Sequence, residues 1–441
     1  MSFLINIASY ILVVGVLVFV HEFGHYAVAK LCGVRVDVFS LGFGKRVLGF
    51  KKGDTDYRLS LLPLGGYVKM AGENPMDTRT GDPGEFASHP RWQRFLIAIA
   101  GPAMNILLAF VVFVGVFMFH YEHPAYTEKP ADIGTVLAGS PAEKAGIKVG
   151  DRIIRILDVD HPTWEQVLPK IALNPDQPVD LTIQRGTEVI KTRLVPQAVG
   201  ANRLGDAGLH PLEPALVELV EAGLPAAKAG IQPGDRIIAA NDTPISWEHE
   251  FIQYLQQNKD APVQITILRN GQQLKFTVKP EYQPNEGRYR IGFVPGTETQ
   301  VDKLPMAAAV VRAYGACRTY SGLIFEIVGK MIRNKMSIKQ FDGPIRIAKY
   351  SGEAAKEKGW SPLMILMAAI SLNLAIFNMF PIPILDGGTM MMLMIEGVMR
   401  RDIKQQVKER VYQVAFVCLV LFVAVVLYND VAKSLPSGYL P

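Results

Sequence analysis

The sequence predicts a polytopic α-helical membrane protein with four transmembrane helices, a small membrane-associated β-sheet and a duplicated β-rich segment. Three observations predict this class. Hydrophobic residues make up 49% of the 441 residues and the mean hydropathy is +0.18, which is too apolar for a purely soluble protein. Several segments are long enough to span a bilayer. One long segment between them contains the same pattern twice.

Composition also excludes some classes. The net charge of +5 is small for this length, and no block of Lys and Arg is interleaved with aromatics, so nothing indicates a nucleic-acid partner. The three cysteines, Cys32, Cys317 and Cys418, are odd in number and widely spaced. This fits neither a disulfide framework nor a CxxC metal site, and we expect them to be small hydrophobic residues.

Four apolar segments are expected to cross the bilayer, which requires roughly 20 apolar residues each. They cover residues 4–31, 95–119, 362–380 and 411–428. The first segment could be mistaken for a signal peptide. Its leading residues, MSFLIN, contain no Lys or Arg, and no small-residue cleavage site follows. We therefore expect a retained helix.

Charge predicts the orientation of these helices. Residues 30–94 contain eleven Lys and Arg residues, and the short connection 381–410 contains five more, whereas the residues just after 119 offer only Lys129. The positive-inside rule then places 33–94 and 381–410 in the cytoplasm. Segment 120–360 and both termini are expected on the opposite side of the membrane, outside the cytoplasm.

A small antiparallel sheet is expected at 33–70. Alternation of apolar and polar residues in VRVDVFS, and again in DYRLSL with Tyr57, Leu59 and Leu61, is typical of half-buried strands. Because the sheet follows the first helix directly, it should lie at the membrane face, where an unpaired edge could accept an extended substrate chain. We expect Tyr57, Leu59 and Leu61 to be substrate-binding residues, and 71–94 to be a cytoplasmic loop.

Segment 120–360 contains a repeat. GSPAEKAGIKVGDRIIRILD (139–158) and GLPAAKAGIQPGDRIIAAND (223–242) agree at thirteen of twenty positions, and each copy predicts a short helix, a GDRI strand, a second helix and a hairpin. Both copies look like PDZ domains of the bacterial type. That resemblance implies that Gly208 and Gly292 line grooves that accept a peptide by strand addition. The alternative is that the two copies are spacers that bind no peptide.

The motif HEFGH at 21–25 lies at the end of the first apolar segment. On a helix, His21 and His25 lie on one face and can bind one cation, while Glu22 can reach a water beside it. The alternative is a pair of hydrogen-bonded core histidines. Three ionisable groups in one turn of a membrane helix are costly unless something compensates, and a divalent metal does so. We therefore expect His21 and His25 to bind Zn²⁺ and Glu22 to be the catalytic base.

A catalytic zinc takes three protein ligands, so one is missing from this motif. The expected topology gives the first and third transmembrane helices the same direction, so that their C-terminal parts share a depth in the membrane. The third ends in NLAIFNMFPIPILDGGTM, where Asp386 is the carboxylate nearest in sequence to the apolar segment. We predict that Asp386 is the third ligand. The alternative is an aspartate that caps the following helix.

These motifs together resemble the site-2 protease family of intramembrane zinc metalloproteases, and within it the bacterial RseP group. The resemblance rests on HEFGH, on GPAMN at 101–105, on FNMFPIPILDGG and on the tandem repeat, and it covers essentially the whole chain. One departure is Thr389, where the family often has histidine. The resemblance implies an endopeptidase in the bacterial inner membrane, with its active site toward the cytoplasmic side. It also implies a function in stress responses by regulated intramembrane proteolysis.

The resemblance also implies a substrate class. Relatives cut single-span membrane proteins, including anti-sigma factors already trimmed outside and signal-peptide remnants. The PDZ pair is expected to act as a size-exclusion filter. Asn378, and less directly Asn373, are expected to contact the unwound substrate backbone, since an amide both donates and accepts hydrogen bonds. An interhelical hydrogen bond is the alternative for Asn378. A non-enzymatic PDZ scaffold is the alternative function, but it leaves the histidines and Asp386 unexplained.

The expected organisation follows the chain in this order: transmembrane helix 1 (1–32), the membrane-associated β-hairpin region (33–70), a cytoplasmic loop (71–94), transmembrane helix 2 (95–119), the first PDZ domain (120–210), the second PDZ domain (211–296), amphipathic periplasmic linker helices (297–360), transmembrane helix 3 with LDGG (361–388), a cytoplasmic connection (389–410), transmembrane helix 4 (411–428) and a periplasmic tail (429–441).

Overall fold

The computed structural model describes residues 2–73, 80–199, 203–245, 247–283, 288–333, 343–356 and 359–434. The chain divides into two compact units. One consists of Met1–Tyr121 together with Asp302–Pro441 and contains the apolar helices; the other is Glu122–Val301 and contains the repeat. Each unit is built around its own apolar clusters. The last seven residues of the expected tail, 435–441, lie outside the described residues.

Four helices in the described part of the chain are long and apolar enough to cross a membrane. They are α1 (Ser2–Leu31), α2 (Arg91–Phe119), α9 (Ser361–Asn378) and α11 (Gln405–Ser434). Each coincides with one of the predicted apolar segments. The helix α2 begins four residues earlier than expected, directly after Pro90, a residue whose restricted backbone favours a helix boundary.

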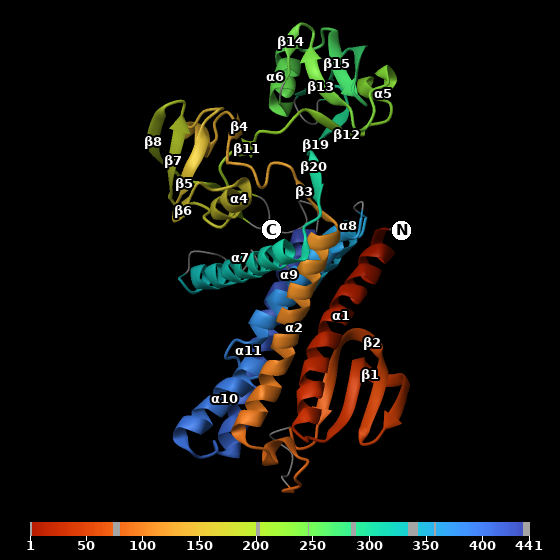
Figure 1. Ribbon diagram of the computed structural model, residues 1–441, viewed down its shortest axis with the longest axis vertical. Helices are drawn as coiled ribbons and strands as arrows, with labels where there is room; N and C mark the ends of the chain where they lie inside the picture. The colour runs from red at the N-terminus through yellow and green to blue at the C-terminus, as the bar shows by residue number, and fades with distance from the viewer. Residues whose placement is uncertain are drawn as a thin grey trace. The chain divides into compact units, whose positions relative to one another are not determined.

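The helix α2 lies between α1 and α9 (Figure 1). Its Phe113 is buried beside Leu372 of α9, and Val13 and Leu17 of α1 pack with Met367 of α9. Apolar side chains therefore join three of the long helices into one core. This core places the second half of α1 against the first half of α2.

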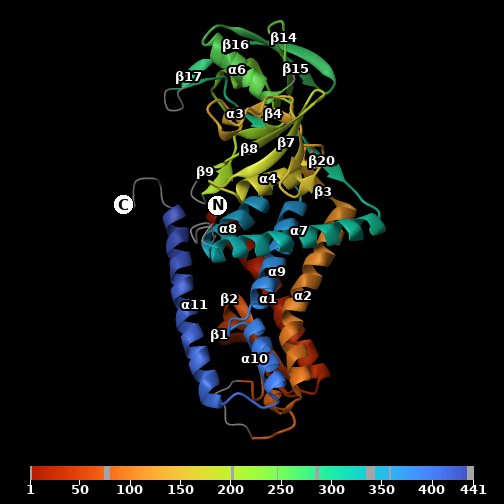
Figure 2. The same ribbon diagram turned by 90° about the vertical axis from the view of Figure 1, so that its left-hand side faces the viewer.

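The helix α11 is attached mainly at its two ends. None of the side chains in its most apolar stretch is buried, and Figure 2 shows it standing apart from α9. At one end Lys408 forms an ion pair of 2.6 Å with the buried Glu396. At the other end Asp430 accepts a hydrogen bond from the backbone N–H of Ile345, in the first turn of α8.

The segment expected as transmembrane helix 3, residues 361–388, is interrupted after its apolar part. The helix α9 ends at Asn378, close to the expected end of the apolar segment at 380, and α10 spans Asp386–Met399. The expected connection 389–410 is therefore largely helical. Pro381 and Pro383 lack the N–H that a continuous helix requires, and a Cβ on Gly388 would overlap the carbonyl of Ile382. The chain turns sharply here and restarts as α10.

The predicted small sheet consists of β1 (Val36–Lys52) and β2 (Thr55–Met70). Both strands fold back on themselves, so that residues 38–41 pair with 56–59 on one side and with 66–69 on the other, while 46–52 pair with 55–60. The sheet therefore consists of four hydrogen-bonded strand segments, with 66–70 at one edge and 46–52 at the other. The edge at 66–70 lies beside α1 (Figure 1).

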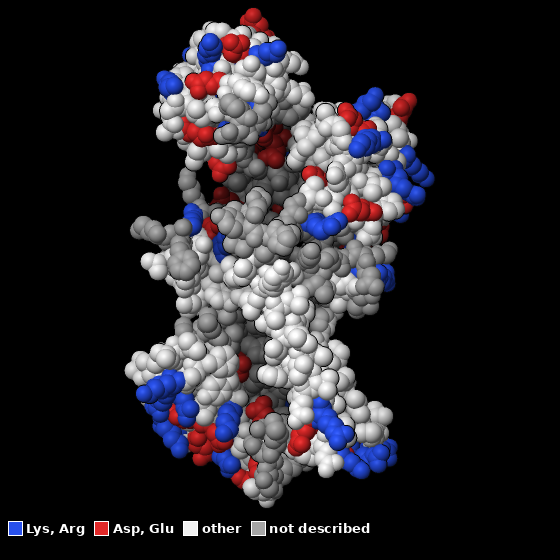
Figure 3. Space-filling model, turned by 180° about the vertical axis from the view of Figure 1, so that it is seen from behind, with Lys and Arg blue, Asp and Glu red and all other residues white. Residues whose placement is uncertain are grey.

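The linker helices are α7 (Met306–Ile332) and α8 (Pro344–Ala354), and a short 3₁₀ helix covers Phe86–Ser88. Lys and Arg side chains gather at one end of the helical unit (Figure 3). Lys51 and Lys52 are the last residues of β1, and Arg400 and Arg401 follow the end of α10. The surface of this unit next to that end carries few charged side chains in the same view.

The second unit contains two similar halves. The first half comprises β3 (Tyr121–Pro124), β4 (Ile133–Val136), α3 (Pro141–Lys144), β5 (Arg152–Ile156), β6 (Val159–Asp160), α4 (Trp164–Ala172), β7 (Val179–Arg185), β8 (Glu188–Leu194), β9 (Gln197–Val199), β10 (Leu204–Asp206) and β11 (Leu209–Pro211). The second comprises β12 (Leu216–Val220), α5 (Pro225–Ala229), β13 (Arg236–Ala240), β14 (Thr243–Pro244), α6 (Glu248–Asn258), β15 (Val263–Arg269), β16 (Gln272–Val278), β17 (Glu281–Gln283), β18 (Arg288–Arg290), β19 (Phe293–Gly296) and β20 (Thr299–Asp302).

The duplication extends to individual contacts. Asp151 in the first half is 1% exposed and pairs with Arg185, which also donates to the carbonyl of Gly146. Asp235 in the second half is equally buried and pairs with Arg269 in the same way. The predicted repeat is therefore present as two cores with the same internal ion pair.

Candidate active site

The two histidines of HEFGH lie on the buried face of α1. His21 is 7% exposed and His25 is 8% exposed, and their Nε2 atoms lie 3.3 Å apart. The spacing of four residues places both imidazoles on one side of the helix, as predicted. Glu22, one residue on, points toward β2 instead.

Asp386 completes a cluster with the two imidazoles. Its Oδ2 lies 3.1 Å from Nε2 of His21 and its Oδ1 lies 3.3 Å from Nε2 of His25. These three residues form a group that could hold one metal ion. Asp386 is the first residue of α10, whose N-cap is Leu385. The alternative that Asp386 caps this helix is therefore not what the structure shows.

The helix α2 orients both imidazoles. Nδ1 of His25 donates to the carbonyl of Ile97 at 2.8 Å, and Nδ1 of His21 lies 3.3 Å from the side-chain amide of Asn105. Both Nε2 atoms therefore face Asp386, and the hydrogen bond to Ile97 leaves the lone pair on Nε2 of His25 available to a metal ion. Asn105 is fully buried, and its backbone carbonyl accepts a hydrogen bond from the Ser371 hydroxyl of α9. Sequence reasoning assigned no role to Asn105, although GPAMN was the available signal.

Gly101, in the same motif, explains why the helices can approach so closely. A Cβ on Gly101 would overlap the His25 imidazole and lie 2.8 Å from Nε2 of His21. Any larger residue would therefore occupy the space of the ligand atoms. The GPAMN motif thus supplies both a gap for the imidazoles and a polar partner for one of them.

Glu22 is held away from the cluster by the sheet. Its Oε2 accepts a hydrogen bond of 3.0 Å from the backbone N–H of Val68, at the free edge of β2. The carboxylate is close to the cluster but does not belong to it. A carboxylate in this position suits a general base better than a ligand.

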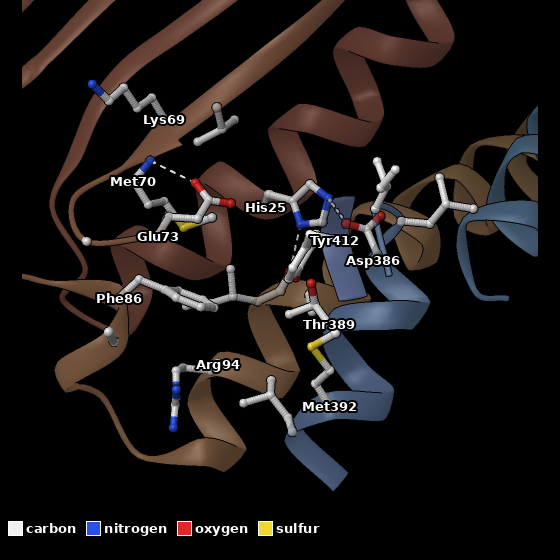
Figure 4. A pocket seen from close by; sticks show the side chains of 18 of the residues that line it. His25, Lys69, Met70, Glu73, Phe86, Arg94, Asp386, Thr389, Met392 and Tyr412 are labelled. Atoms are coloured by element: carbon white, nitrogen blue, oxygen red, sulfur yellow. Dashed lines mark hydrogen bonds and ion pairs between the residues drawn. The ribbon is translucent and has the colours of Figure 1, made fainter. Parts of the chain in front are cut away.

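A cavity of about 460 Å³ adjoins the cluster. It is lined by residues of α1, β2, α2, α10 and α11 and of the turn that follows β2, including His25, Glu73, Asp386 and Tyr412. Figure 4 shows His25 and Asp386 at one side of this cavity and Arg94 and Met392 at another. The space is large enough for a segment of extended peptide chain.

Asn378 and Asn373, the two asparagines predicted to contact substrate, lie in different surroundings. Asn378 is the last residue of α9, and its side-chain nitrogen lies 3.4 Å from Nε2 of His21. Asn373 is exposed on the surface of α9. The structure thus brings Asn378 to the cluster and leaves Asn373 outside it.

Tyr57, Leu59 and Leu61 lie on the sheet but not at its edge toward α1. Tyr57 and Leu59 pair with β1 residues on both sides, so their backbone groups are already used. The phenol of Tyr57 is hydrogen-bonded to that of Tyr26 on α1, and Leu61 is 64% exposed. The free backbone beside the cluster belongs to residues 66–70 instead.

Gly208 and Gly292 are tightly packed. Both have φ above +60°, a conformation that favours glycine. A Cβ on Gly208 would overlap Ser140, and one on Gly292 would overlap Leu224. Their carbonyls accept from the N–H groups of Leu137 and Glu221. Both glycines thus shape the loop at the start of a short helix in equivalent positions of the two halves.

A set of apolar helices that buries two imidazoles beside a partly buried carboxylate, with a separate glutamate at a cavity, is the arrangement expected of a membrane-embedded metallopeptidase. The model of peptidase family M50 matches residues 9–422. The chain belongs to this family, and the prediction of a zinc metallopeptidase is thereby confirmed at the level of the family.

Individual relatives extend this likeness to the whole chain. The regulator of sigma-E protease RseP of Escherichia coli is 33% identical over 98% of this chain and 100% of its own length. A protein named as a zinc metalloprotease in Neisseria meningitidis is 31% identical over 98% and 99%. Among solved structures, the PDZ domain of an SdrC-like protein from Listeria monocytogenes matches 19% of this chain and 87% of its own, with 23% identity and a TM-score of 0.18.

Proposed function

We propose that this chain is a zinc-dependent intramembrane endopeptidase that hydrolyses the transmembrane segments of single-span membrane proteins. The observation that carries the proposal is the cluster of His21, His25 and Asp386 with Glu22 alongside. The cluster lies beside the second half of an apolar helix, at the depth where a transmembrane substrate could reach it.

The donor atoms fit zinc. Bonds of about 2.0–2.1 Å in a tetrahedral arrangement separate ligand atoms by about 3.3 Å. The separations here, between the two Nε2 atoms and from each to Asp386, are 3.1–3.3 Å. Two imidazoles and a carboxylate form a donor set typical of catalytic zinc, which leaves a fourth position open.

Zinc bound at this cluster would act as a Lewis acid toward the attacking water and the scissile carbonyl. Glu22 then takes the proton of the attacking water and transfers it to the leaving amine. The hydrogen bonds from Nδ1 of His25 to Ile97 and of His21 to Asn105 keep the imidazoles in place throughout.

A substrate helix must unwind before it can be cut, because its carbonyls are hydrogen-bonded within the helix. The edge of β2 at 66–70 offers backbone groups to an unwound chain, and the edge borders the cavity through Val68 and Met70. Strand addition at this edge would place a peptide alongside Glu22. Asn378 lies close enough to the cluster to bind a carbonyl of the same peptide.

We infer that the substrates include pre-trimmed anti-sigma factors and signal-peptide remnants. The name of the E. coli relative, which is called a regulator of sigma-E protease, supports the first because it ties that protease to a sigma factor. The chain would reside in a bacterial inner membrane with its basic end in the cytoplasm, which the clustering of Lys and Arg supports. The repeat, as two PDZ domains, would lie in the periplasm and exclude substrates with bulky outer domains.

One experiment tests the enzymatic proposal. The purified protein is assayed for bound metal and for cleavage of a model single-span helix, together with Glu22→Gln, His21→Ala, His25→Ala and Asp386→Ala. We expect Glu22→Gln to keep zinc and to lose cleavage by a factor of roughly 10² or more, and the other three to lose zinc. Cleavage by folded Glu22→Gln at the wild-type rate would refute the proposal.

A further inference from the structure

The free edge of β2 is occupied by side chains rather than by another strand. In the described part of the chain, β2 pairs only with β1. Successive N–H groups of a strand point to opposite edges. The N–H of Ala71 donates to Arg35, on the inner side, so the N–H groups of Val68 and Met70 point outward, toward α1 and the cavity.

Both outward N–H groups are bound by glutamates. Val68 donates to Oε2 of Glu22 at 3.0 Å, and Met70 donates to Oε2 of Glu73 at 3.1 Å. Glu73 follows the strand by a tight turn, in which its own N–H contacts the carbonyl of Met70 at 3.4 Å. Figure 4 shows its carboxylate reaching back over the end of the strand, on the side of His25.

The carboxylates of Glu22 and Glu73 accept the hydrogen bonds that the carbonyl groups of an added strand would accept. An added strand presents carbonyls to one edge at every second residue, about 6.8 Å apart. Val68 and Met70 are two residues apart and need two acceptors at that spacing. In this structure the acceptors are Glu22 from α1 and Glu73 from the turn.

We propose, resting on the proposed function, that Glu22 and Glu73 hold the edge of β2 in place of a substrate and that an incoming strand displaces both. Displacement from Val68 leaves the Glu22 carboxylate free to face the attacking water. The base is therefore released when a peptide has docked on the edge. Glu73 competes with substrate two residues further along, so it is a residue that sets substrate affinity.

The proposal is tested with the full-length, zinc-loaded enzyme in detergent at pH 8. A fluorogenic single-span helix is the substrate, and the variants are Glu73→Ala, Glu73→Asp and Glu73→Gln. Alanine removes the acceptor, aspartate keeps the charge but is too short to reach Met70, and glutamine keeps the reach but not the charge. We expect KM to fall by roughly threefold to tenfold for alanine and aspartate, and less for glutamine.

Amide hydrogen exchange of residues 66–73 in the substrate-free enzyme gives an independent readout. It should be faster in Glu73→Ala and Glu73→Asp than in wild type and Glu73→Gln. The proposal is overturned if KM of the alanine variant equals or exceeds that of wild type. It is also overturned if alanine and glutamine behave alike while aspartate resembles wild type, because charge alone would then explain the effect.

Failure of this inference is distinguishable from failure of the proposed function. If wild type cleaves and Glu22→Gln does not, the enzyme proposal stands whatever the KM values of the Glu73 variants are. If wild type with bound zinc cleaves no transmembrane helix, the enzyme proposal itself fails. The hydrogen-exchange comparison still reports in that case whether Glu73 protects the edge.

Discussion

The side-chain amide of Asn105 on α2 lies 3.3 Å from Nδ1 of His21 on α1. When Nε2 of His21 binds a metal ion, its lone pair is used by the metal, so Nδ1 carries the proton and must donate. The acceptor is then Oδ1 of Asn105, which is buried and lacks a partner when the amide nitrogen faces the imidazole. Exchange of the amide oxygen and nitrogen, which are distinguished only by their hydrogen bonds, brings Oδ1 to the imidazole and lets Nδ1 of His21 donate to it.

Replacement of Asn105 by alanine should weaken zinc binding by roughly 10-fold to 100-fold, because the imidazole of His21 loses the group that orients it. Competition with a chromophoric chelator measures the affinity. Asn373→Ala is the matched control, since this asparagine is exposed on α9. Equal affinities of the two variants would show that Asn105 does not orient His21.

Gly101→Ala should abolish zinc binding, because its Cβ would overlap the His25 imidazole. Gly115→Ala lies on the same helix with no neighbouring atom within 4 Å of the added Cβ, so it should keep zinc and be slightly stabilised. Metal content of the two purified variants is the measurement. If Gly101→Ala retained zinc, α1 and α2 would not be as close as described.

Glu73 should make stability depend on pH. Burial raises the pKa of its carboxyl from the ordinary 4.5 to about 7, so the folded protein binds this proton more tightly than the unfolded chain. The associated stability is full below pH 4.5 and is lost as the pH rises through 7, by up to about 3 kcal/mol.

Glu73→Gln carries no such proton, so its Tm relative to wild type should rise between pH 5 and pH 8. Thermal unfolding of both proteins in the same detergent at each pH checks this. The comparison is made between variants at one pH, so that all other groups contribute equally to both proteins. A constant difference in Tm would mean that Glu73 ionises normally in the folded protein.

The orientation in the membrane can be tested with single cysteines. After replacement of the three free cysteines by serine, Lys52→Cys and Arg401→Cys should be protected from an impermeant thiol reagent added to spheroplasts. Gln273→Cys should be labelled. All three side chains are exposed, so protection would report the membrane barrier rather than burial. The reverse pattern would place the basic end outside.

Deletion of residues 127–294 tests the size filter. Every group assigned to metal binding or catalysis lies outside this range, so cleavage of a substrate with a short outer tail should change only a few-fold. Substrates with a folded outer domain should be cut by the deleted protein and not by the intact one, because exclusion by size needs no specific peptide contact. If deletion stopped cleavage of the short-tailed substrate while zinc stayed bound, the repeat would be recruiting substrates.

Substitution of Gly208 or Gly292 cannot test peptide binding by the PDZ grooves on its own. A bulky residue at Gly208 or Gly292 would overlap Ser140 or Leu224 and would also require a strained backbone. Such variants disturb the folding of the domain as well as any groove. The sequence pattern identified both positions correctly as equivalent, but only the packing revealed what each glycine faces.

The sequence by itself determined the four apolar helices, the duplication and the histidine pair on α1, because these depend on composition and on periodic spacing within one segment. His21 and His25 are four residues apart on a helix wherever that helix packs. Asp386 could also be selected as a candidate partner of the two histidines, since a carboxylate beside an apolar segment is rare and the expected topology restricted the candidates.

Only the tertiary structure decided which backbone and side-chain groups surround that cluster. The partner of His21 is Asn105, and the proposed base Glu22 accepts a hydrogen bond from Val68. Both partners come from segments far away in the chain. The edge next to the site is 66–70 rather than the strand that contains Tyr57 and Leu59. The spacing of apolar residues within one segment indicates which of its side chains are buried. The register of a folded-back sheet and the packing of two helices depend on contacts between distant segments, which local spacing does not encode.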